Sequence, residues 1–205
     1  MGVTRFDIDA FVLAGGASTR MGVDKALLPI GEQPMLLRMT RLVEPLVARV
    51  SVIGSPQRYA PLGVTVFPDD VPSLGPLGGI LTALRHAESP WFLILGCDLP
   101  YLRSDWLHWL IGAGLDSEAA VVMPLGPAGY EPLCAMYQQR CAESIADAMS
   151  RNVRKITDAL MDLTLEVVPP GAWKQFDSEG TLFQNMNLPE DYAAARARIE
   201  RREKN

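Results

Sequence analysis

The segment Trp91–Gly96 constrains the fold more than any other part of the sequence, because all six of its residues are apolar. A strand with no polar face has to be covered on both sides, as the central strands of parallel sheets are. We therefore expect this segment at the centre of a sheet that carries helices on both faces. Asp98 then follows close to the carboxyl end of this strand.

Strand and helix patterns alternate over the rest of the chain. Short apolar runs closed by glycine, proline or aspartate predict further strands at 8–14, 49–54, 64–67, 119–123 and 132–137. Helical periodicity and composition predict helices at 34–47, 80–86, 104–111, 142–149 and 189–202. This order predicts a three-layer α/β fold with a doubly wound, mostly parallel, Rossmann-like sheet, whose ligands bind at the carboxyl ends of strands. The 205 residues contain no internal repeat and fit one domain, 1–205.

The composition excludes several classes of protein. A formal charge of -5 gives no broad basic field for a nucleic acid, and no apolar run has the length of a membrane helix or a signal peptide. The three cysteines lack C-x-x-C spacing, which argues against a disulfide framework or a zinc site. His86 and His108 have no ligand partner at a suitable spacing, so we expect them to pack on helices. We expect a cytoplasmic protein that binds small ligands, not nucleic acid or membrane.

A glycine-rich segment, LAGGASTRMGVDK, follows the first predicted strand from Leu13 to Lys25. Glycines let backbone N–H groups approach an anion, Ser18 and Thr19 can donate hydrogen bonds, and Arg20 and Lys25 supply charge for a triphosphate. The spacing is neither that of a Walker loop nor that of a dinucleotide fingerprint. We interpret the segment as a phosphate loop; the alternative is a glycine turn with solvated charges.

A second candidate site is Asp98, which follows the central strand in the sequence Gly96-Cys97-Asp98-Leu99-Pro100. Magnesium is commonly held by one or two carboxylates together with substrate phosphates, so a single aspartate that faces the phosphate loop can suffice. The alternative is that Asp98 is a turn residue before Pro100.

Four segments together resemble the molybdenum cofactor guanylyltransferases, which are MobA-like NTP transferases with a sugar-nucleotidyltransferase-like fold. The glycine-rich segment is similar to the family pattern LAGG-x-S-x-RMG-x-DK, and GPLGGI at 75–80 resembles its GPL[AG]G turn. CDLP at 97–100 resembles its CDxP metal corner, and NMNLPED at 185–191 its late N-x-N-x-PED signature. The resemblance spans most of the chain and implies the Rossmann-like nucleotidyltransferase fold.

The resemblance also implies roles for individual residues. Arg20, Lys25 and Asp98 would be catalytic, with Asp98 as the Mg²⁺ ligand. The residues that would bind the nucleotide or the acceptor are Leu13, Ala14, Gly15, Gly16, Ser18, Lys25, Asp69, Gly78, Asn185 and Asn187. Asp69 and its neighbour Asp70 could instead form a solvated turn, and Asn187 could cap the last helix.

Two further segments are candidates for contacts with the acceptor, the first by resemblance and the second by its positive charge. Tyr130 and Glu131 are candidates for acceptor contacts, although an ordinary loop before a core strand is the simpler interpretation. Arg151, Arg154 and Lys155 could receive an acceptor phosphate or could be a solvated helix start.

The activity that the resemblance implies is transfer of GMP from GTP to molybdopterin or molybdenum cofactor, with Mg²⁺ as cofactor and pyrophosphate as the second product. Molybdenum-insertion and molybdoenzyme maturation proteins would be partners. One alternative is a molybdopterin or other cytidylyltransferase that uses CTP, in which the loop more often begins LAAG than LAGG. Another is a catalytically silent nucleotide-binding maturation subunit, which the presence of both Lys25 and Asp98 disfavours. A dinucleotide-binding domain is disfavoured by the loop spacing.

Overall fold

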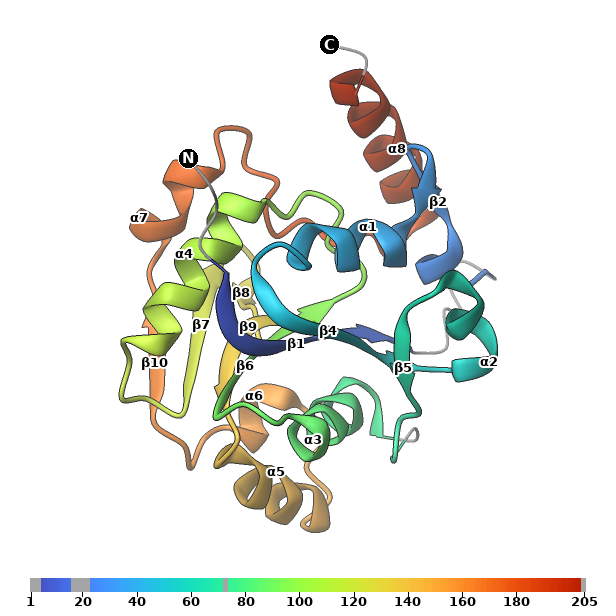
Figure 1. The fold of residues 1–205 in the computed structure, drawn as a ribbon. Helices are drawn as coiled ribbons and strands as arrows, with labels where there is room; N and C mark the ends of the chain where they lie inside the picture. Colours follow the sequence, from blue (N-terminus) through green and yellow to red (C-terminus); the bar gives the residue numbers. More distant parts are fainter. Residues whose placement is uncertain (1–4, 16–22, 72–73, 204–205) are drawn as a thin grey trace.

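The computed structural model describes residues 5–15, 23–71 and 74–203, and its centre is a mixed, mostly parallel sheet (Figure 1). The strand order is β10-β7-β9-β6-β1-β4-β5, with β8 paired to β7. The bounds are β1 Phe6–Ala14, β4 Val47–Gly54, β5 Thr65–Phe67, β6 Trp91–Gly96, β7 Val121–Gly126, β8 Gly129–Tyr130, β9 Cys134–Gln138 and β10 Leu165–Val168. A separate small sheet pairs β2 (Pro29–Ile30) with β3 (Gln33–Pro34). The predicted three-layer α/β fold is confirmed.

Strand β6 lies in the middle of the sheet, and all six of its residues are buried, as the sequence predicts. It pairs in parallel with β1, which pairs in parallel with β4 on its other side. Strand β9 runs antiparallel to both β6 and β7, a direction that the apolar pattern does not reveal. The cause is the connection between β7 and β9, which is too short for the crossover that parallel strands need.

Helices cover both faces of the sheet. The helices are α1 Met35–Val43, α2 Pro56–Tyr59, α3 Pro76–His86, α4 Ser104–Leu115, α5 Cys141–Ser150, α6 Ile156–Ala159, α7 Pro170–Trp173 and α8 Pro189–Glu203. Figure 1 shows α1 and α4 on one face and α3, α5 and α6 on the other. The core divides accordingly into two clusters, and alternate residues of β1, such as Phe11 and Val12, enter opposite clusters.

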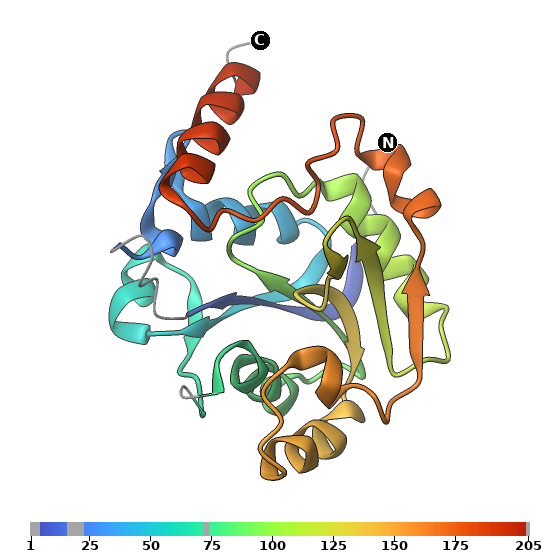
Figure 2. The ribbon, with the colours of Figure 1, turned by 180° about the vertical axis from the view of Figure 1, so that it is seen from behind.

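Several helices differ from their predicted bounds. Helix α3 begins at Pro76, four residues before the predicted start, because Gly75 with a φ of 60° turns the chain directly into it. Helix α4 continues to Leu115 through Gly114, where an added Cβ would lie 2.7 Å from the Met136 side chain, so glycine permits close packing on β9. The last helix extends outward from the rest of the fold (Figure 2).

The histidines and cysteines behave as the sequence predicts. His86 stacks on Phe67 with ring centroids 4.0 Å apart, and His108 packs on Phe6 at 4.9 Å. All three cysteines are free and buried. Among the residues that the structure describes, no helix is both long and apolar enough to cross a membrane.

At the carboxyl ends of β1 and β4, the Ala14 carbonyl and the Tyr59 ring both lie close to Gly54. Ala14 and Gly54 are register partners there. A Cβ on Gly54 would lie 2.1 Å from the Ala14 carbonyl oxygen and 2.7 Å from the Tyr59 ring. Only glycine therefore lets the ends of the two strands and Tyr59 pack together, and this packing forms one wall of the site described next.

Candidate active site

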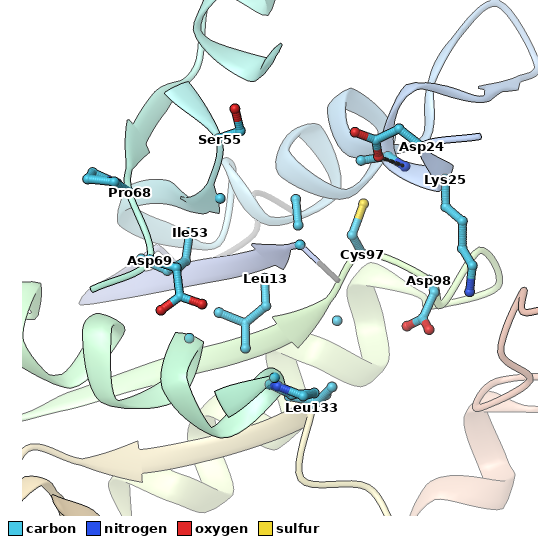
Figure 3. Close-up of a pocket in the computed structure, with 18 of the residues that line it drawn as sticks. Leu13, Asp24, Lys25, Ile53, Ser55, Pro68, Asp69, Cys97, Asp98 and Leu133 are labelled. Atoms are coloured by element: carbon cyan, nitrogen blue, oxygen red, sulfur yellow. Dashed lines mark hydrogen bonds between the residues drawn. The ribbon is translucent and has the colours of Figure 1, made fainter. Parts of the chain in front are cut away.

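A pocket of 510 Å³ opens at the carboxyl ends of β1, β4 and β6 (Figure 3). Strand β1 contributes Leu13 and Ala14 to its lining, and the segments that follow β1, β4, β5 and β6, together with the start of α3, contribute most of the remainder. The strand order changes direction at β1, with β4 on one side and β6 on the other. This is the switch point at which open α/β sheets bind ligands, so the fold and the pocket agree on where a ligand would lie.

Lys25 is the one cationic side chain among the described residues that line this pocket. It begins a 3-10 turn, η1 (Lys25–Leu27), whose preceding residue Asp24 accepts a hydrogen bond from the Ala26 N–H at 3.1 Å. The Lys25 Nζ donates to the Asn187 Oδ1 at 2.7 Å, a contact between residues 162 positions apart in the chain. The ammonium group is thereby held in the pocket and not left free in solvent.

Asp98 lies just after β6 and points into the same part of the pocket as the Lys25 ammonium (Figure 3). Burial raises the pKa of its carboxyl group, and the positive charge of Lys25 opposes that shift. A Cβ on Gly96 would lie 2.9 Å from the Asp98 Oδ1, so glycine leaves room for the carboxylate. The Asp98 carbonyl accepts from the Met186 N–H at 2.9 Å, which ties the segment before α8 to this corner.

Asp69 lines the opposite side of the pocket from Asp98 (Figure 3). Its Oδ1 accepts from the Val71 N–H at 2.9 Å. Asp70 lies outside the pocket lining and pairs with Arg85 at 3.0 Å. The two adjacent aspartates therefore differ, and only Asp69 is available to a ligand in this pocket.

The structure brings together most of the expected site residues that it describes. Leu13, Ala14, Gly15, Lys25, Asp69 and Asp98 all line the pocket. Asn187 reaches it through Lys25, and its own backbone N–H donates to Asp191 at 2.9 Å. Gly16, Ser18 and Arg20 lie outside the described residues.

Besides Asn187, two expected residues lie outside the pocket lining. Gly78 packs beneath the Val71 carbonyl, which an added Cβ would approach to 2.4 Å. The close approach keeps the loop that carries Asp69 against α3. Asn185 is exposed, two positions before Asn187.

Several pocket residues were not predicted from the sequence. Asp24, Ser55, Gln57, Cys97 and Leu133 line the pocket without having been assigned a role. Asp24 stands inside the glycine-rich motif beside Lys25, and that position was a usable signal. The others contribute ordinary side chains that only the folded chain brings to this edge.

The basic residues Arg151, Arg154 and Lys155 are exposed and engaged with neighbours on their own surface. Arg151 pairs with Asp147 at 3.1 Å and with Asp162 at 3.3 Å. Arg154 donates to Asn152, and Lys155 pairs with Asp158. These contacts are those of a solvated surface.

Glu131 is half-buried between β8 and β9, and burial together with the negative charge of Asp98 raises its pKa to about 7. An added Cβ on Gly126 would lie 2.4 Å from the Glu131 Oε1, so the carboxyl group lies close over this glycine. Glu131 stands two residues before Leu133, which lines the pocket, whereas Tyr130 is exposed.

Because its pKa is raised, Glu131 should lower the free energy of unfolding by an amount that depends on pH. A carboxyl group with a raised folded-state pKa destabilises the fold when ionised; this cost is full above pH 7 and disappears as the pH falls towards 4.5. Glu131→Gln should therefore raise Tm at pH 8 by about 3 °C, or about 1 kcal/mol after allowance for solvent screening. The gain should vanish near pH 4.5. Thermal melts across this range in the presence of a chelator measure it.

The exposed Glu118 provides the matched control for this measurement. Glu118→Gln should change Tm by less than about 1 °C across the same pH range. A rise in Tm of Glu131→Gln that does not depend on pH would contradict the claim that ionised Glu131 destabilises the fold.

Comparison with known proteins agrees with the fold. The family model for the MobA-like NTP transferase domain matches residues 10–164. A probable molybdenum cofactor guanylyltransferase from Nostoc sp. is 33% identical over 202 residues, which cover 95% of this chain and 93% of the relative. One from Clostridium perfringens strain 13 is 28% identical over 186 residues, with 89% and 93% covered.

Two solved structures show the same fold. Molybdopterin-guanine dinucleotide biosynthesis protein A from Archaeoglobus fulgidus superposes with a TM-score of 0.82 at 23% identity, covering 94% of this chain and 99% of that one. The 2-C-methyl-D-erythritol 4-phosphate cytidylyltransferase from Thermus thermophilus gives 0.71 at 14% identity, covering 95% and 99%. The fold is thus shared by a protein whose name refers to a guanine nucleotide and by one whose name refers to a cytidine nucleotide.

These comparisons, with the pocket at the switch point, define the protein as a nucleotidyltransferase. Within that class, the chain belongs to the MobA-like NTP transferase family. The resemblance stated from the sequence motifs is confirmed.

Proposed function

We propose that this protein transfers the GMP moiety of GTP to molybdopterin or molybdenum cofactor and releases pyrophosphate. The observation that carries the proposal is the convergence of Lys25 and Asp98 in one pocket at the ends of β1 and β6. The names of the relatives, molybdenum cofactor guanylyltransferases, support the identity of donor and acceptor.

The proposed reaction is an in-line displacement at phosphorus. An oxygen of the acceptor phosphate attacks the α-phosphorus of GTP, and the bond from that phosphorus to the oxygen bridging to the β-phosphorus breaks. The electron pair of that bond leaves with pyrophosphate. Because a phosphate monoester is already anionic, the protein needs no strong base, and catalysis consists of positioning and charge neutralisation.

The assignments of individual residues combine the places of the described residues around the pocket with the motifs that the sequence shares with the family. Lys25 would neutralise phosphate charge, assisted by Arg20. The loop residues Leu13, Ala14, Gly15, Gly16 and Ser18 would bind the nucleotide. Asn185 and Asn187 would lie towards the acceptor, since Asn187 meets Lys25 near Asp98.

Asp98 fits a magnesium ion by its donor chemistry. Its carboxylate supplies two hard oxygen atoms whose lone pairs suit a divalent cation. Among residues 5–15, 23–71 and 74–203, no three His, Cys, Asp or Glu side chains gather into a metal site. This agrees with a magnesium ion held by one carboxylate together with substrate phosphates and water. When bound, it would neutralise charge that develops on the phosphates.

Asp69 would contact the nucleoside, because it lies across the pocket from Asp98 and Lys25 (Figure 3). Asp69→Asn should raise the KM for GTP about tenfold with a smaller change in kcat, since a hydrogen bond to a charged group contributes about 1.5–3 kcal/mol. The adjacent Asp70→Asn is the matched control and should leave the KM within about twofold. Steady-state kinetics with both variants measures this, and equal effects of the two would contradict the assignment.

The proposal is tested by incubating the purified protein and Mg²⁺ with molybdopterin and either GTP or CTP. Pyrophosphate release and the mass of the product are measured. Release with GTP and a guanylylated pterin are expected. Release only with CTP would make the protein a cytidylyltransferase, and release with neither would favour a silent nucleotide-binding subunit that serves maturation partners.

A further inference from the structure

Asp24 is an unexpected residue in a pocket proposed to bind phosphates. Its carboxylate lines the pocket beside Lys25, where a free negative charge would repel the ligand. The side chain is only 18% exposed. A carboxylate in such a place needs partners from the protein itself.

Three donors satisfy the two oxygens of Asp24. The Oδ1 accepts from the Ala26 N–H at 3.1 Å, which caps the turn that Lys25 begins. The Oδ2 accepts from the Tyr59 hydroxyl at 2.9 Å and from Arg58 at 3.2 Å. The charge of Asp24 is therefore directed to α2 and to the Lys25 turn and away from a ligand.

Tyr59 supports the site from two directions. Its ring packs against Gly54, on the side of that residue where the Ala14 carbonyl also approaches. Its hydroxyl reaches Asp24, near the other end of the glycine-rich segment. Tyr59 is 2% exposed, and burial together with Asp24 raises its pKa, so the phenol remains a protonated donor. One side chain thus connects the end of β4 with the Lys25 end of the glycine-rich segment.

We propose that Tyr59, assisted by Arg58, is a positioning residue for Lys25 and acts through Asp24. The chain of contacts runs from the Tyr59 hydroxyl to the Asp24 carboxylate, and from there to the Ala26 N–H of the Lys25 turn. Lys25 in turn meets Asn187 at 2.7 Å. This inference rests on the proposed function for its effect on turnover, but its effect on the Lys25 turn does not depend on any substrate.

Tyr59→Phe removes the hydroxyl and keeps the ring that packs on Gly54. We expect kcat/KM for GTP to fall about tenfold, mainly through kcat, while Tm stays within about 3 °C of the wild type. Tyr137→Phe is the matched control, since it removes a buried hydroxyl that donates to the Pro132 carbonyl at 2.8 Å in the opposite core cluster. Its kcat/KM should stay within about twofold of the wild type.

The link to Lys25 is tested by a double-mutant cycle. In a Lys25→Ala background, Tyr59→Phe should lower kcat/KM for GTP by less than about twofold. The effects of two substitutions are not additive when one residue acts through the other. A full tenfold loss in that background, or no loss in the wild-type background, would overturn the proposal.

Hydrogen exchange of the Ala26 amide supplies a readout without substrate. The amide should exchange about tenfold faster in Tyr59→Phe than in Tyr137→Phe, since its acceptor Asp24 loses an anchor. Equal exchange would overturn the proposal even if turnover falls. If the wild-type protein releases no pyrophosphate with GTP, the proposed function fails, and the exchange experiment still decides the role of Tyr59.

Discussion

Lys25→Ala should lower kcat/KM for GTP by about 10²- to 10³-fold and leave Tm within about 3 °C of the wild type. Removing one preorganised donor to a developing phosphate charge typically costs about that much in rate. The stability should change little, because the Lys25 side chain lies in the pocket. Its hydrogen bond to Asn187 would be lost, but one such bond contributes only about 0.5–1.5 kcal/mol. Steady-state rates and thermal melts on the same preparation measure both quantities.

The exposed Lys174 provides a control for loss of a positive charge. Lys174→Ala should change neither kcat/KM nor Tm measurably. If Lys25→Ala loses Tm in proportion to its loss of rate, Lys25 is a structural residue and its assignment to phosphate binding is wrong.

Asp98→Asn should abolish more than about 99.9% of turnover, since several kcal/mol of charge stabilisation at the phosphates would be lost. The effect on stability should have the opposite sign. Burial raises the pKa of Asp98, so its ionised form destabilises the fold at neutral pH, and a neutral amide of the same shape removes that cost. Without metal and at pH 8, Tm should be equal to that of the wild type or higher.

The exposed Asp116 is a suitable control, because Asp116→Asn removes the same charge far from the pocket lining. It should leave turnover within about twofold. A fall in Tm of more than about 5 °C in Asp98→Asn would mean that Asp98 serves the turn before Pro100, which was the alternative interpretation from the sequence.

Features that depend on short stretches of chain were predictable from the sequence. The bounds of β6 follow from its uninterrupted apolar run, and the position of Asp98 at its end follows from the bounds. The fold class follows from the alternation of strands and helices. The pairing of β9 with β6 could not be predicted, because an apolar run carries no information about which neighbours it joins, whereas its direction relative to β7 follows from the short connection between the two strands.

The internal contacts of the site were harder to predict for the same reason. The hydrogen bond from Lys25 to Asn187 joins two motifs that the sequence analysis recognised separately. Nothing in either motif states that their side chains meet. Tyr59 lies in none of the recognised motifs. Its role depends on Gly54 in another element, because only a glycine there lets the Tyr59 ring pack so closely.

The central claim is that the α-phosphate of GTP moves to the acceptor, and the most direct measurement follows that phosphorus. The protein is incubated with Mg²⁺, molybdopterin and GTP labelled with ³²P at either the α or the γ position. The account predicts that the α label appears in the pterin product and the γ label in pyrophosphate. A γ label in the pterin product or in inorganic phosphate, or an α label that stays in free nucleotide, would contradict it.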